Sequence, residues 1–561
     1  MAVPKGKLKK ILIESGLVTP AQFEDSVGEA EEEGKSIESI LMEKDLISDS
    51  QLGQIEADIL GFSYIDLKEQ LIPEDILNII PEGVARKQKI IAFGQDKNDI
   101  KLAMNEPDNL EIIEFIQKKT NKKAVPYFAT FQDVEEAFAR YRKELKEEFK
   151  DIIKKGITEV RGLGRGAREV PIIKIVDTLL QQAYQDRASD LHLEPLEEKT
   201  TVRFRIDGIL YDIIDLPKDI HDLLITRLKI MAKMRTDEHQ AAQDGRFEIM
   251  LDSEKVDIRV SIIPISDGEK AVLRLLSRAG RELSLEELGL KGQDFKKLKE
   301  NIRRPYGMIL ATGPTGSGKT TTLYAILKIL NTREVNIATI EDPVEYSIIG
   351  INQIQVNPKT NLTFAEGLKS IIRQDPNIIM VGEIRDEETA GIATNAAMTG
   401  HLVLSTLHTN NAATTLPRLL DMKVEPYLIS STVNIAIAQR LVRKICMSCI
   451  ESYQPAEEEL ENLREKINLN KILNKNHKKL VLYRGKGCPM CHQTGYRGRI
   501  GIFEVLEMKE NIKDLVMKNA NAGEIEKQAI TNGMTTIFED GIQKALTGIT
   551  TIEEVLRVTE E

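Results

Sequence analysis

The stretch Gly313-Pro-Thr-Gly-Ser-Gly-Lys-Thr320 matches the phosphate-binding pattern G-x-x-x-x-G-K-[ST] at every position. The apolar run 308–312 before it predicts a buried strand, and the apolar spacing of 320–330 predicts a helix. Glycines at such a junction let backbone N–H groups approach phosphates, and the helix N-terminus favours their negative charge. We therefore expect a P-loop in which Lys319 reaches the β- and γ-phosphates and Thr320 ligates Mg²⁺. The residues expected to hold the nucleotide are Gly313, Pro314, Thr315, Gly316, Ser317, Gly318, Lys319, Thr320 and Thr321.

The composition limits the class of protein. The chain has 561 residues, enough for three or four domains, and 41% of them are hydrophobic, which is enough for several cores. The formal net charge of −11 argues against a motor that holds nucleic acid on a broadly basic surface. No apolar run approaches the length of a membrane span, and no charged-then-apolar signal opens the chain. We therefore expect a cytoplasmic protein that reaches a membrane only through partners.

The N-terminal region contains a short internal repeat. Segments 8–19 and 37–48 each combine a Leu/Ile cluster, a turn and a Thr or Ser cap with Gln three positions later. They predict a helical subdomain over residues 1–60. We interpret it as a docking domain; the sharper alternative is a sensor of a cyclic dinucleotide.

Residues 61–145 have the pattern of a mixed α/β subdomain. Strands are predicted at 89–93 and 100–104, and helices at 110–119 and 131–143. The charged and glycine-rich stretch 146–168 has no apolar strand before its glycines. It therefore predicts a linker and not a dinucleotide loop.

Residues 169–283 predict a second α/β domain. A helix is expected at 171–186, and strands at 190–194, 201–207, 255–261 and 271–276. Any single surface arginine is most often solvated, but several on strands beside a nucleotide domain could stabilise phosphate charge across a subunit boundary. The arginines of this segment are Arg203, Arg205, Arg235, Arg246, Arg259 and Arg274.

The nucleotide domain, residues 284–561, carries two acidic clusters that follow apolar strands. Strand 337–340 leads into 341–345, and strand 378–381 leads into 382–386. Carboxylates at the ends of parallel strands can face a γ-phosphate and its metal. Glu383 is the best candidate for orienting the attacking water, and Gly382 occupies the usual place of a Walker B acid.

Two histidines, His401 and His408, flank a predicted strand at 402–406. A lone histidine is usually structural, whereas one at each end of a central strand equally suits a sensor of phosphate or water.

The four cysteines form two CxxC pairs, Cys446 with Cys449 and Cys488 with Cys491. Four thiolates suit tetrahedral Zn²⁺, and we expect a structural site that clamps an insertion at about 443–500. The alternatives are disulfides, a redox dithiol and, for residues 488–492, c-type haem attachment. Disulfides are disfavoured in a reducing cytoplasm, and the last two would leave one CxxC pair unexplained.

Together these motifs resemble the secretion-superfamily hexameric ATPases, specifically those of type IV pilus assembly and type II secretion. The resemblance covers 170–561 closely and the N-terminal region loosely. It rests on the paired CxxC and on segments 188–195, 203–208, 243–246, 313–320, 341–345, 382–386, 399–409 and 501–506.

The resemblance implies an α/β multidomain fold: a RecA-like P-loop NTPase C-terminal domain, a PAS-like N2 domain and a mixed helical/α+β N-terminal domain, in a homohexamer. It assigns Glu341 and Asp342 to the Asp box, Glu383 to the Walker B motif, and His401 and His408 to the His box. It also implies that arginines of the N2 domain close over the phosphates; the candidates are Arg205, Arg246, Arg259 and Arg274.

The N-terminal repeat resembles a cyclic-di-GMP-binding module whose pattern begins Arg-Leu-Gly. The corresponding positions here read Lys7-Leu8-Lys9 and Ser36-Ile37-Glu38, so both arginines and both glycines are missing. Glu38 would repel phosphate. We therefore do not expect tight binding of cyclic-di-GMP.

The function that follows is a cytoplasmic ATPase motor for type IV pilus assembly, acting through an inner-membrane platform protein. The close alternative is the ATPase of a type II secretion system. A DNA-translocating RecA-like motor and a non-catalytic nucleotide-sensing scaffold are the remaining alternatives; we expect no nucleic-acid partner.

Overall fold

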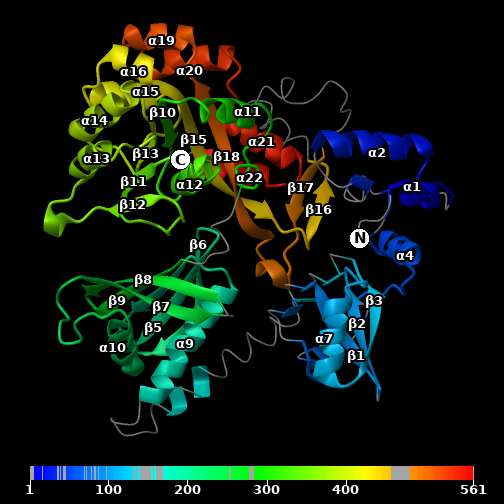
Figure 1. The fold of residues 1–561 in the computed structure, drawn as a ribbon. Coiled ribbons are helices and arrows are strands. Elements are labelled where there is room, and N and C mark those ends of the chain that lie inside the picture. Colours follow the sequence, from blue (N-terminus) through cyan, green and yellow to red (C-terminus); the bar gives the residue numbers. More distant parts are fainter. Residues whose placement is uncertain are drawn as a thin grey trace. The chain divides into compact units, whose positions relative to one another are not determined.

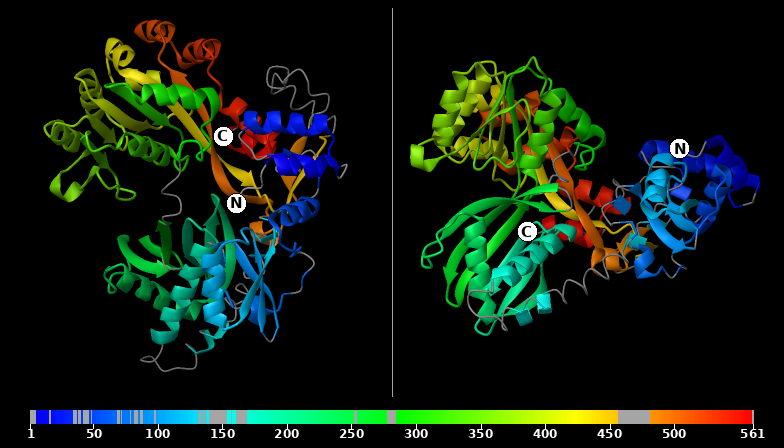
Figure 2. Two further views of the ribbon diagram at one scale, coloured as in Figure 1. Left: turned by 45° about the vertical axis from the view of Figure 1, so that its right-hand side comes forward. Right: turned by 60° about the horizontal axis from the view of Figure 1, so that its bottom comes forward.

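The computed structural model describes two compact units, and each is considered by itself (Figures 1 and 2). The first comprises residues 1–182 and 488–492, and the second comprises residues 183–487 and 493–561. The described residues are 5–14, 17–33, 37, 40–41, 46–47, 49–67, 70, 72–77, 79–80, 84–85, 88–96, 98–130, 133–134, 137–138, 153–155, 157–159, 169–251, 254–276, 284–455 and 481–559. Most of the predicted linker 146–168 and of the predicted helix 131–143 lies outside these residues.

The first unit begins with helices around a small apolar core. Helices α1 (Lys5–Glu14), α2 (Pro20–Glu33) and α4 (Asp49–Leu60) contribute to a buried cluster that includes Leu8, Leu12 and Phe23. The predicted capping pair is present in the first repeat, since the Thr19 amide donates to Gln22 Oε1 at 2.9 Å and the Gln22 amide donates to Thr19 Oγ1 at 3.3 Å. The Ser cap of the second repeat lies outside the described residues.

The predicted α/β subdomain follows. Strands β1 (Ile90–Gln95), β2 (Asp99–Met104) and β3 (Lys123–Phe128) form a sheet in that order, and α7 (Leu110–Thr120) lies between β2 and β3 in the chain. The two predicted strands and the helix at 110–119 are confirmed. Strand β3 was not predicted.

The second unit begins with the PAS-like domain. Its strands form a six-stranded antiparallel sheet in the order β6-β5-β4-β9-β8-β7, so strands far apart in the chain lie side by side. The predicted helix and four strands are confirmed, and β6 and β7 are additional. The elements are α9 (Glu169–Gln185, which crosses the unit boundary), β4 (Asp190–Pro195), β5 (Lys199–Ile206), β6 (Ile209–Pro217), α10 (His221–Met231), β7 (Gln243–Leu251), β8 (Glu254–Ile265) and β9 (Gly268–Leu276).

The nucleotide domain is built on a seven-stranded sheet in the order β12-β11-β13-β14-β10-β15-β18. All neighbours pair in parallel except β15 and β18. The strands are β10 (Gly307–Thr312), β11 (Ile337–Glu341), β12 (Asn352–Gln355), β13 (Ile378–Val381), β14 (Leu402–Leu407), β15 (Val433–Ile445) and β18 (Tyr496–Glu507), with the hairpin β16 (Ile450–Tyr453) and β17 (Leu482–Gly485) between the last two.

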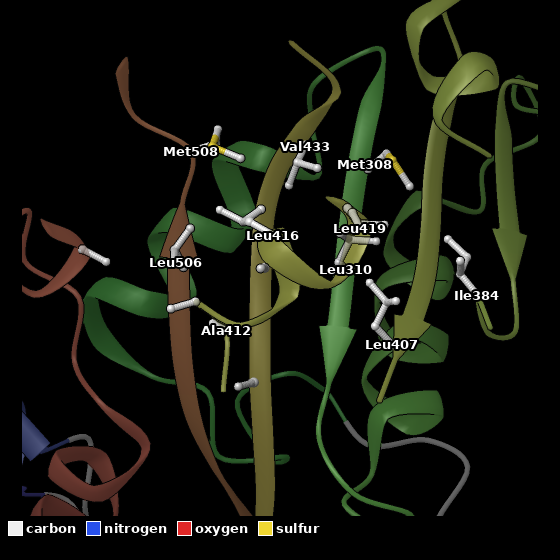
Figure 3. Packing of buried hydrophobic residues seen from close by; sticks show 14 of the residues in the cluster. Met308, Leu310, Ile384, Leu407, Ala412, Leu416, Leu419, Val433, Leu506 and Met508 are labelled. Carbon is white, nitrogen blue, oxygen red and sulfur yellow. The ribbon is translucent and has the colours of Figure 1, made fainter. Parts of the chain in front are cut away.

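Helices cover both faces of this sheet. Alternate residues along each strand face opposite sides, as the two-residue period of a strand requires. Leu310 and Ile340 belong to the core that includes α13–α16 and α19–α22, whereas Ile309 and Ile437 belong to the core that includes α11 and α12. Figure 3 shows Leu310, Leu416 and Leu419 gathered in the first core. The helices are α11 (Gly292–Asn301), α12 (Lys319–Leu330), α13 (Phe364–Ile372), α14 (Glu387–Met398), α15 (Thr415–Asp421), α16 (Pro426–Thr432), α19 (Glu510–Met517), α20 (Ala522–Thr531), α21 (Ile537–Leu546) and α22 (Ile552–Thr559).

Among the described residues, no helix has the length and apolar character that a membrane span requires.

Candidate functional site

The candidate site lies where three parallel strands of the nucleotide domain end. Strand β14 pairs with β10 on one side and with β13 on the other, all in the same direction. Parallel strands end at a common edge. The fold therefore brings together the P-loop after Thr312, the acid Glu383 after β13 and His408 after β14, three motifs that are separate in the sequence.

The P-loop requires glycine at Gly313 for two reasons. Its backbone φ is 142°, a value that L-residues with a side chain rarely adopt. A Cβ atom there would also lie 2.4 Å from the backbone oxygen of Gln439 and 2.7 Å from Ser317 Oγ. A Cβ at Gly318 would lie 2.8 Å from Gln439 Nε2. The loop is therefore pressed closely against strand β15.

Lys319 is buried and folds back on its own loop. Its Nζ donates to the carbonyl oxygens of Gly313 at 2.8 Å and Pro314 at 3.1 Å. Burial lowers the pKa of Lys319, and the negative charge of Glu383 opposes this shift. An ammonium group held by neutral carbonyls in a buried position is suited to exchange them for phosphate oxygens.

The remaining loop residues present polar atoms to the same place. Ser317 is buried, and its Oγ has no hydrogen-bond partner within the described part of the chain. Buried polar groups are normally paired, so this orphaned hydroxyl fits a ligand that accepts or donates a hydrogen bond. Thr320 and Thr321 are half-buried. Pro314, Thr315 and Gly316 form the exposed part of the loop.

Glu383 lies among charged side chains at the edge of the sheet. Its side chain is 12% exposed, and Oε2 lies 2.6 Å from Arg385 Nε and 3.2 Å from His408 Nε2. Thr406 Oγ1 donates to the backbone oxygen of Gly382 at 2.7 Å, which ties β14 to the turn that carries Glu383. The carboxylate is thus held by two neighbours and lies close enough to Lys319 to affect its pKa.

Glu341, at the end of β11, is almost completely buried in a polar network. The Tyr324 hydroxyl of α12 donates to one carboxylate oxygen. Thr339 Oγ1, at 2.5 Å, and Gln353 Nε2, at 3.2 Å, donate to the other. Burial and the charge of Glu341 both raise the pKa of Tyr324. Asp342, the next residue, is exposed.

His401 lies at the opposite edge of the sheet from His408. It precedes β14, where its backbone oxygen accepts from the Gly307 amide at the start of β10, at 3.1 Å. Its Nδ1 lies 2.9 Å from the backbone oxygen of Ala396. The structure therefore brings His408 to the P-loop and Glu383, but it does not bring His401 there.

The four candidate arginines of the PAS-like domain lie in one row across its sheet. Arg205 pairs in register with Asp190, Asp190 with Arg274, Arg274 with Arg259, and Arg259 with Arg246. Residues directly opposite each other share a face of the sheet. The row therefore carries four cations and one anion, and like charges placed opposite each other are unfavourable without a further anion.

These arginines differ in their partners. Asp190 is buried, and it is 2.9 Å from Arg274 Nε and 3.5 Å from Arg205 Nε. Arg259 instead reaches the segment that follows β11: it donates to the Val344 backbone oxygen at 2.8 Å and lies 3.2 Å from Glu345 Oε2. Arg246 is exposed.

The four cysteines come together as the sequence predicts. Their sulfur atoms lie within 4.8 Å of one another, and Cys488 Sγ is 3.6 Å from Cys491 Sγ. A tetrahedron with Zn–S distances of about 2.3 Å has sulfur–sulfur edges of about 3.8 Å. The four thiols therefore fit a Zn²⁺ ion.

The N-terminal positions compared with the cyclic-di-GMP module are partly described. Lys9 forms an ion pair with Glu24 on α2. The side chain of Lys7 and residues Ser36 and Glu38 lie outside the described residues.

Sequence reasoning missed two residues that shape the site. Gln439 supports the P-loop from β15, and its Oε1 accepts from Thr322 Oγ1 at 2.7 Å. Tyr324 joins α12 to Glu341. Neither lies in a nucleotide motif, and the only sequence signal was a polar side chain within an otherwise apolar run.

Comparison with known proteins gives two family matches. A family model described as "Type II/IV secretion system protein" matches residues 166–557, and one described as "MshEN domain" matches residues 60–148.

Relatives of two kinds are similar to the chain over much of its length. It is 38% identical over 564 residues to the type IV pilus assembly ATPase PilB of Myxococcus xanthus, which covers 98% of both chains. It is 45% identical to the type II secretion system protein E of Pseudomonas aeruginosa, over 72% of this chain and 79% of that protein. The protein of the same name from Xanthomonas campestris pv. campestris is 38% identical over 94% of both chains.

The fold is also similar to that of a solved structure. The X-ray structure of the Legionella pneumophila ATPase DotB has a TM-score of 0.51 at 22% identity, over 69% of this chain and 95% of that chain. This likeness agrees with the predicted RecA-like fold.

Proposed function

The chain belongs to the family of type II/IV secretion system proteins, and from this premise we propose that it is a Mg-dependent ATPase that powers type IV pilus assembly. The observation that carries the proposal is that the P-loop, Glu383 and His408 follow three neighbouring parallel strands, with Glu383 beside His408 and its charge acting on Lys319. An ammonium group for the phosphates and a carboxylate for water are the two groups that ATP hydrolysis needs there.

In the proposed reaction, Lys319 exchanges its bonds to the loop carbonyls for bonds to the β- and γ-phosphates of ATP. Thr320 would hold Mg²⁺, whose charge offsets that of the phosphates. Glu383 orients a water molecule and takes its proton as the water oxygen attacks the γ-phosphorus, and ADP leaves. His408 keeps the Glu383 carboxylate directed toward the water.

We assign the arginine row to phosphate recognition. Arg205, Arg246, Arg259 and Arg274 share one face and have Asp190 as the only acid in their row. Glu345 pairs with Arg259 from outside the row, and the phosphates of ATP would supply the remaining negative charge. Closure of the row over the nucleotide would couple hydrolysis to movement of the PAS-like domain.

The four-cysteine cluster is proposed to bind one structural Zn²⁺. The ion would join the end of β15 to the turn after β17. Two backbone hydrogen bonds support the same connection: the Cys446 amide donates to the Gly495 oxygen and the Lys486 amide donates to the Cys449 oxygen, both at 2.9 Å. The ion would hold the insertion in place without taking part in hydrolysis.

The proposed assembly is a homohexamer at the cytoplasmic face of the inner membrane. It would turn a platform protein there and dock to a membrane ring through its N-terminal domain. We propose no binding of nucleic acid or cyclic-di-GMP; Lys9, which stands where the cyclic-di-GMP module has glycine, is paired with Glu24.

A type II secretion motor is the second candidate, and one observation favours it. Similarity to a type II secretion protein E extends over 94% of both chains, so the N-terminal region does not by itself favour the pilus. The two systems need the same hydrolysis chemistry and differ in the platform that receives the work.

The experiment replaces Glu383 with Gln in the native host and scores surface pili and secreted proteins together. Loss of pili with normal secretion supports the pilus motor, whereas loss of secretion with normal pili transfers the protein to the type II system. Glu388→Gln, an exposed change at the start of α14, is the matched control and should affect neither. If Glu383→Gln leaves both processes intact, the proposed motor function is wrong.

A further inference from the structure

A buried carboxylate lies in the core of the nucleotide domain, away from every nucleotide motif. Glu504 on β18 is 3% exposed, and it faces the same core as Ile502 and Leu506 on its own strand. Burying a carboxylate among apolar side chains is costly unless hydrogen bonds compensate. A carboxylate in this position therefore indicates a specific interaction.

Within the described part of the chain, Glu504 has two hydrogen-bond donors, both backbone amides. Oε1 accepts from Ala412 at 2.9 Å, and Oε2 accepts from Ile537, the first residue of α21, at 3.4 Å. Figure 3 shows Ala412 beside the strands that include β18. The carboxylate therefore connects the segment that follows β14 to the N-terminal end of α21, where the helix dipole favours an anion.

The segment in question, residues 408–415, begins with His408. Besides Glu504, the segment is held by Thr312, the last residue of β10. The Oγ1 atom of Thr312 accepts a hydrogen bond from the Thr409 amide at 3.0 Å. Thr409 Oγ1 also lies 3.1 Å from Thr415 Oγ1, which closes the segment on itself. Segment 408–415 is thus held at two points, the P-loop strand and Glu504.

We infer that Glu504 is a positioning residue, whose ionised carboxylate holds segment 408–415 and thereby keeps His408 against Glu383. An ionised carboxylate accepts from both amides, whereas a protonated one turns an O–H toward one of them and loses that bond. Glu504 touches neither nucleotide nor water in this scheme. The inference rests on the proposed ATPase function.

The electrostatic surroundings place this change near neutral pH. Burial raises the pKa of Glu504 to about 7, the carboxylates of Glu526 on α20 and Asp294 on α11 act in the same direction, and the two amides oppose them. On α21, Asp540 and Lys544 pair with each other at 2.6 Å. The segment itself carries His408, which pairs with Glu383.

The test compares the pH dependence of ATP turnover in the full-length chain with Mg-ATP and in its Glu504→Gln variant. Glutamine keeps the shape of the side chain and cannot ionise. We expect kcat of the unmodified protein to fall as the pH drops through about 7. The variant should be about fivefold slower at pH 8, the effect of one hydrogen bond, with no such step and an unchanged KM. Profiles of identical shape would overturn the inference.

A second measurement does not depend on activity. Hydrogen exchange of residues 408–415 at pH 8 should be about fivefold faster in Glu504→Gln, while β10 exchanges as before. Glu507→Gln on the same strand is the matched control, because Glu507 contacts Asn301 and not the segment; it should change neither readout. If the unmodified protein does not hydrolyse ATP, the proposed function fails, and the exchange data still decide the role of Glu504: unchanged exchange would refute it.

If Glu504→Gln does not fold, Glu504→Asp replaces it in both measurements. Aspartate keeps the charge but shortens the reach by one methylene. It should also speed exchange in segment 408–415, and it should keep a pH step because it still ionises. Exchange equal to that of the unmodified protein would again refute the inference.

Discussion

His408 and Glu383 meet at the ends of two adjacent parallel strands, with the imidazole Nε2 3.2 Å from the carboxylate Oε2. A base that is itself oriented by a third group is the arrangement that positions a proton acceptor for hydrolysis. The pair exists because β13 and β14 run in register, Val381 opposite Ser405, so that the residues just beyond each strand come together.

Replacing Glu383 with Gln should lower kcat for ATP hydrolysis at least about 100-fold, since the group that accepts the proton of water is lost. ATP binding should persist because the P-loop is unchanged. Phosphate release and equilibrium binding of ATP measure the two effects. Glu388→Gln should retain full turnover, and a Glu383 variant within tenfold of the unmodified protein would exclude the assigned role.

Replacing Lys319 with Ala should weaken ATP binding by about 10- to 100-fold, because a hydrogen bond to a charged group contributes about that much to affinity. The same change should abolish phosphate release. The matched control is Lys328→Ala, on the same helix but about two and a half turns beyond Lys319, which should bind ATP normally. Unchanged turnover in Lys319→Ala would mean that the nucleotide site is elsewhere. ATP turnover that neither requires DNA nor rises when DNA is added would distinguish the chain from a DNA motor. Any ATP turnover would exclude a non-catalytic scaffold.

Alanine substitutions at two glycines of the P-loop distinguish the effect of steric crowding from the effect of backbone strain. Gly313→Ala should destabilise the nucleotide domain by about 3 kcal/mol or more, because its Cβ meets the backbone of Gln439 and its φ is positive. Gly316→Ala should cost only about 1–2 kcal/mol, since its φ is +79° but no atom lies within 4 Å of the added Cβ. Thermal unfolding and ATP binding of both variants test this order, and equal effects would contradict it.

Glu504 predicts a pH dependence of stability with a defined sign. A carboxyl whose pKa is raised from 4.5 to about 7 by burial costs nothing below pH 4.5, where both states are protonated. The cost grows between pH 4.5 and 7 and reaches about 3 kcal/mol above pH 7. Urea unfolding at pH 5 and pH 8 should therefore show a loss of stability in the unmodified protein that Glu504→Gln lacks. The same loss of stability in both proteins would argue against a raised pKa of Glu504 as its cause.

Zinc analysis tests the cysteine cluster. The purified protein should contain about one zinc ion per chain, and Cys446→Ser combined with Cys488→Ser should remove it. The insertion should then be cut more readily by protease, while Lys319→Ala, remote in the chain, should keep its zinc. Metal analysis that finds no zinc in the unmodified protein would overturn the assignment.

Much of the nucleotide domain could be predicted because its motifs are local. The P-loop, the strands before the two acidic clusters and the paired cysteines each depend on a few consecutive residues. The arginine row could not be predicted, because it depends on which residues of five strands lie opposite each other. Gln439 was missed for the same reason: its contact with Gly313 arises only when β15 pairs with β10.

The two histidines show a different limit. The sequence placed them at the two ends of one strand, yet a strand has its ends at opposite edges of the sheet. Grouping His401 with His408 rested on their positions at the two ends of this strand and on the family resemblance. The register of β10 with β14 separates them, since Gly307 lies opposite Leu402 and Thr312 opposite Leu407.

The position of β10 in the sheet also constrains how the domain can form during synthesis. Met308 pairs with Val403 on one side and with Val433 on the other, and both partners are made much later than the P-loop. Closing such long loops is slow, and β10 has no neighbour until they close. A ribosome must therefore complete β15 before the P-loop gains its support from Gln439, so a nascent chain carries the nucleotide motif well before it can use it.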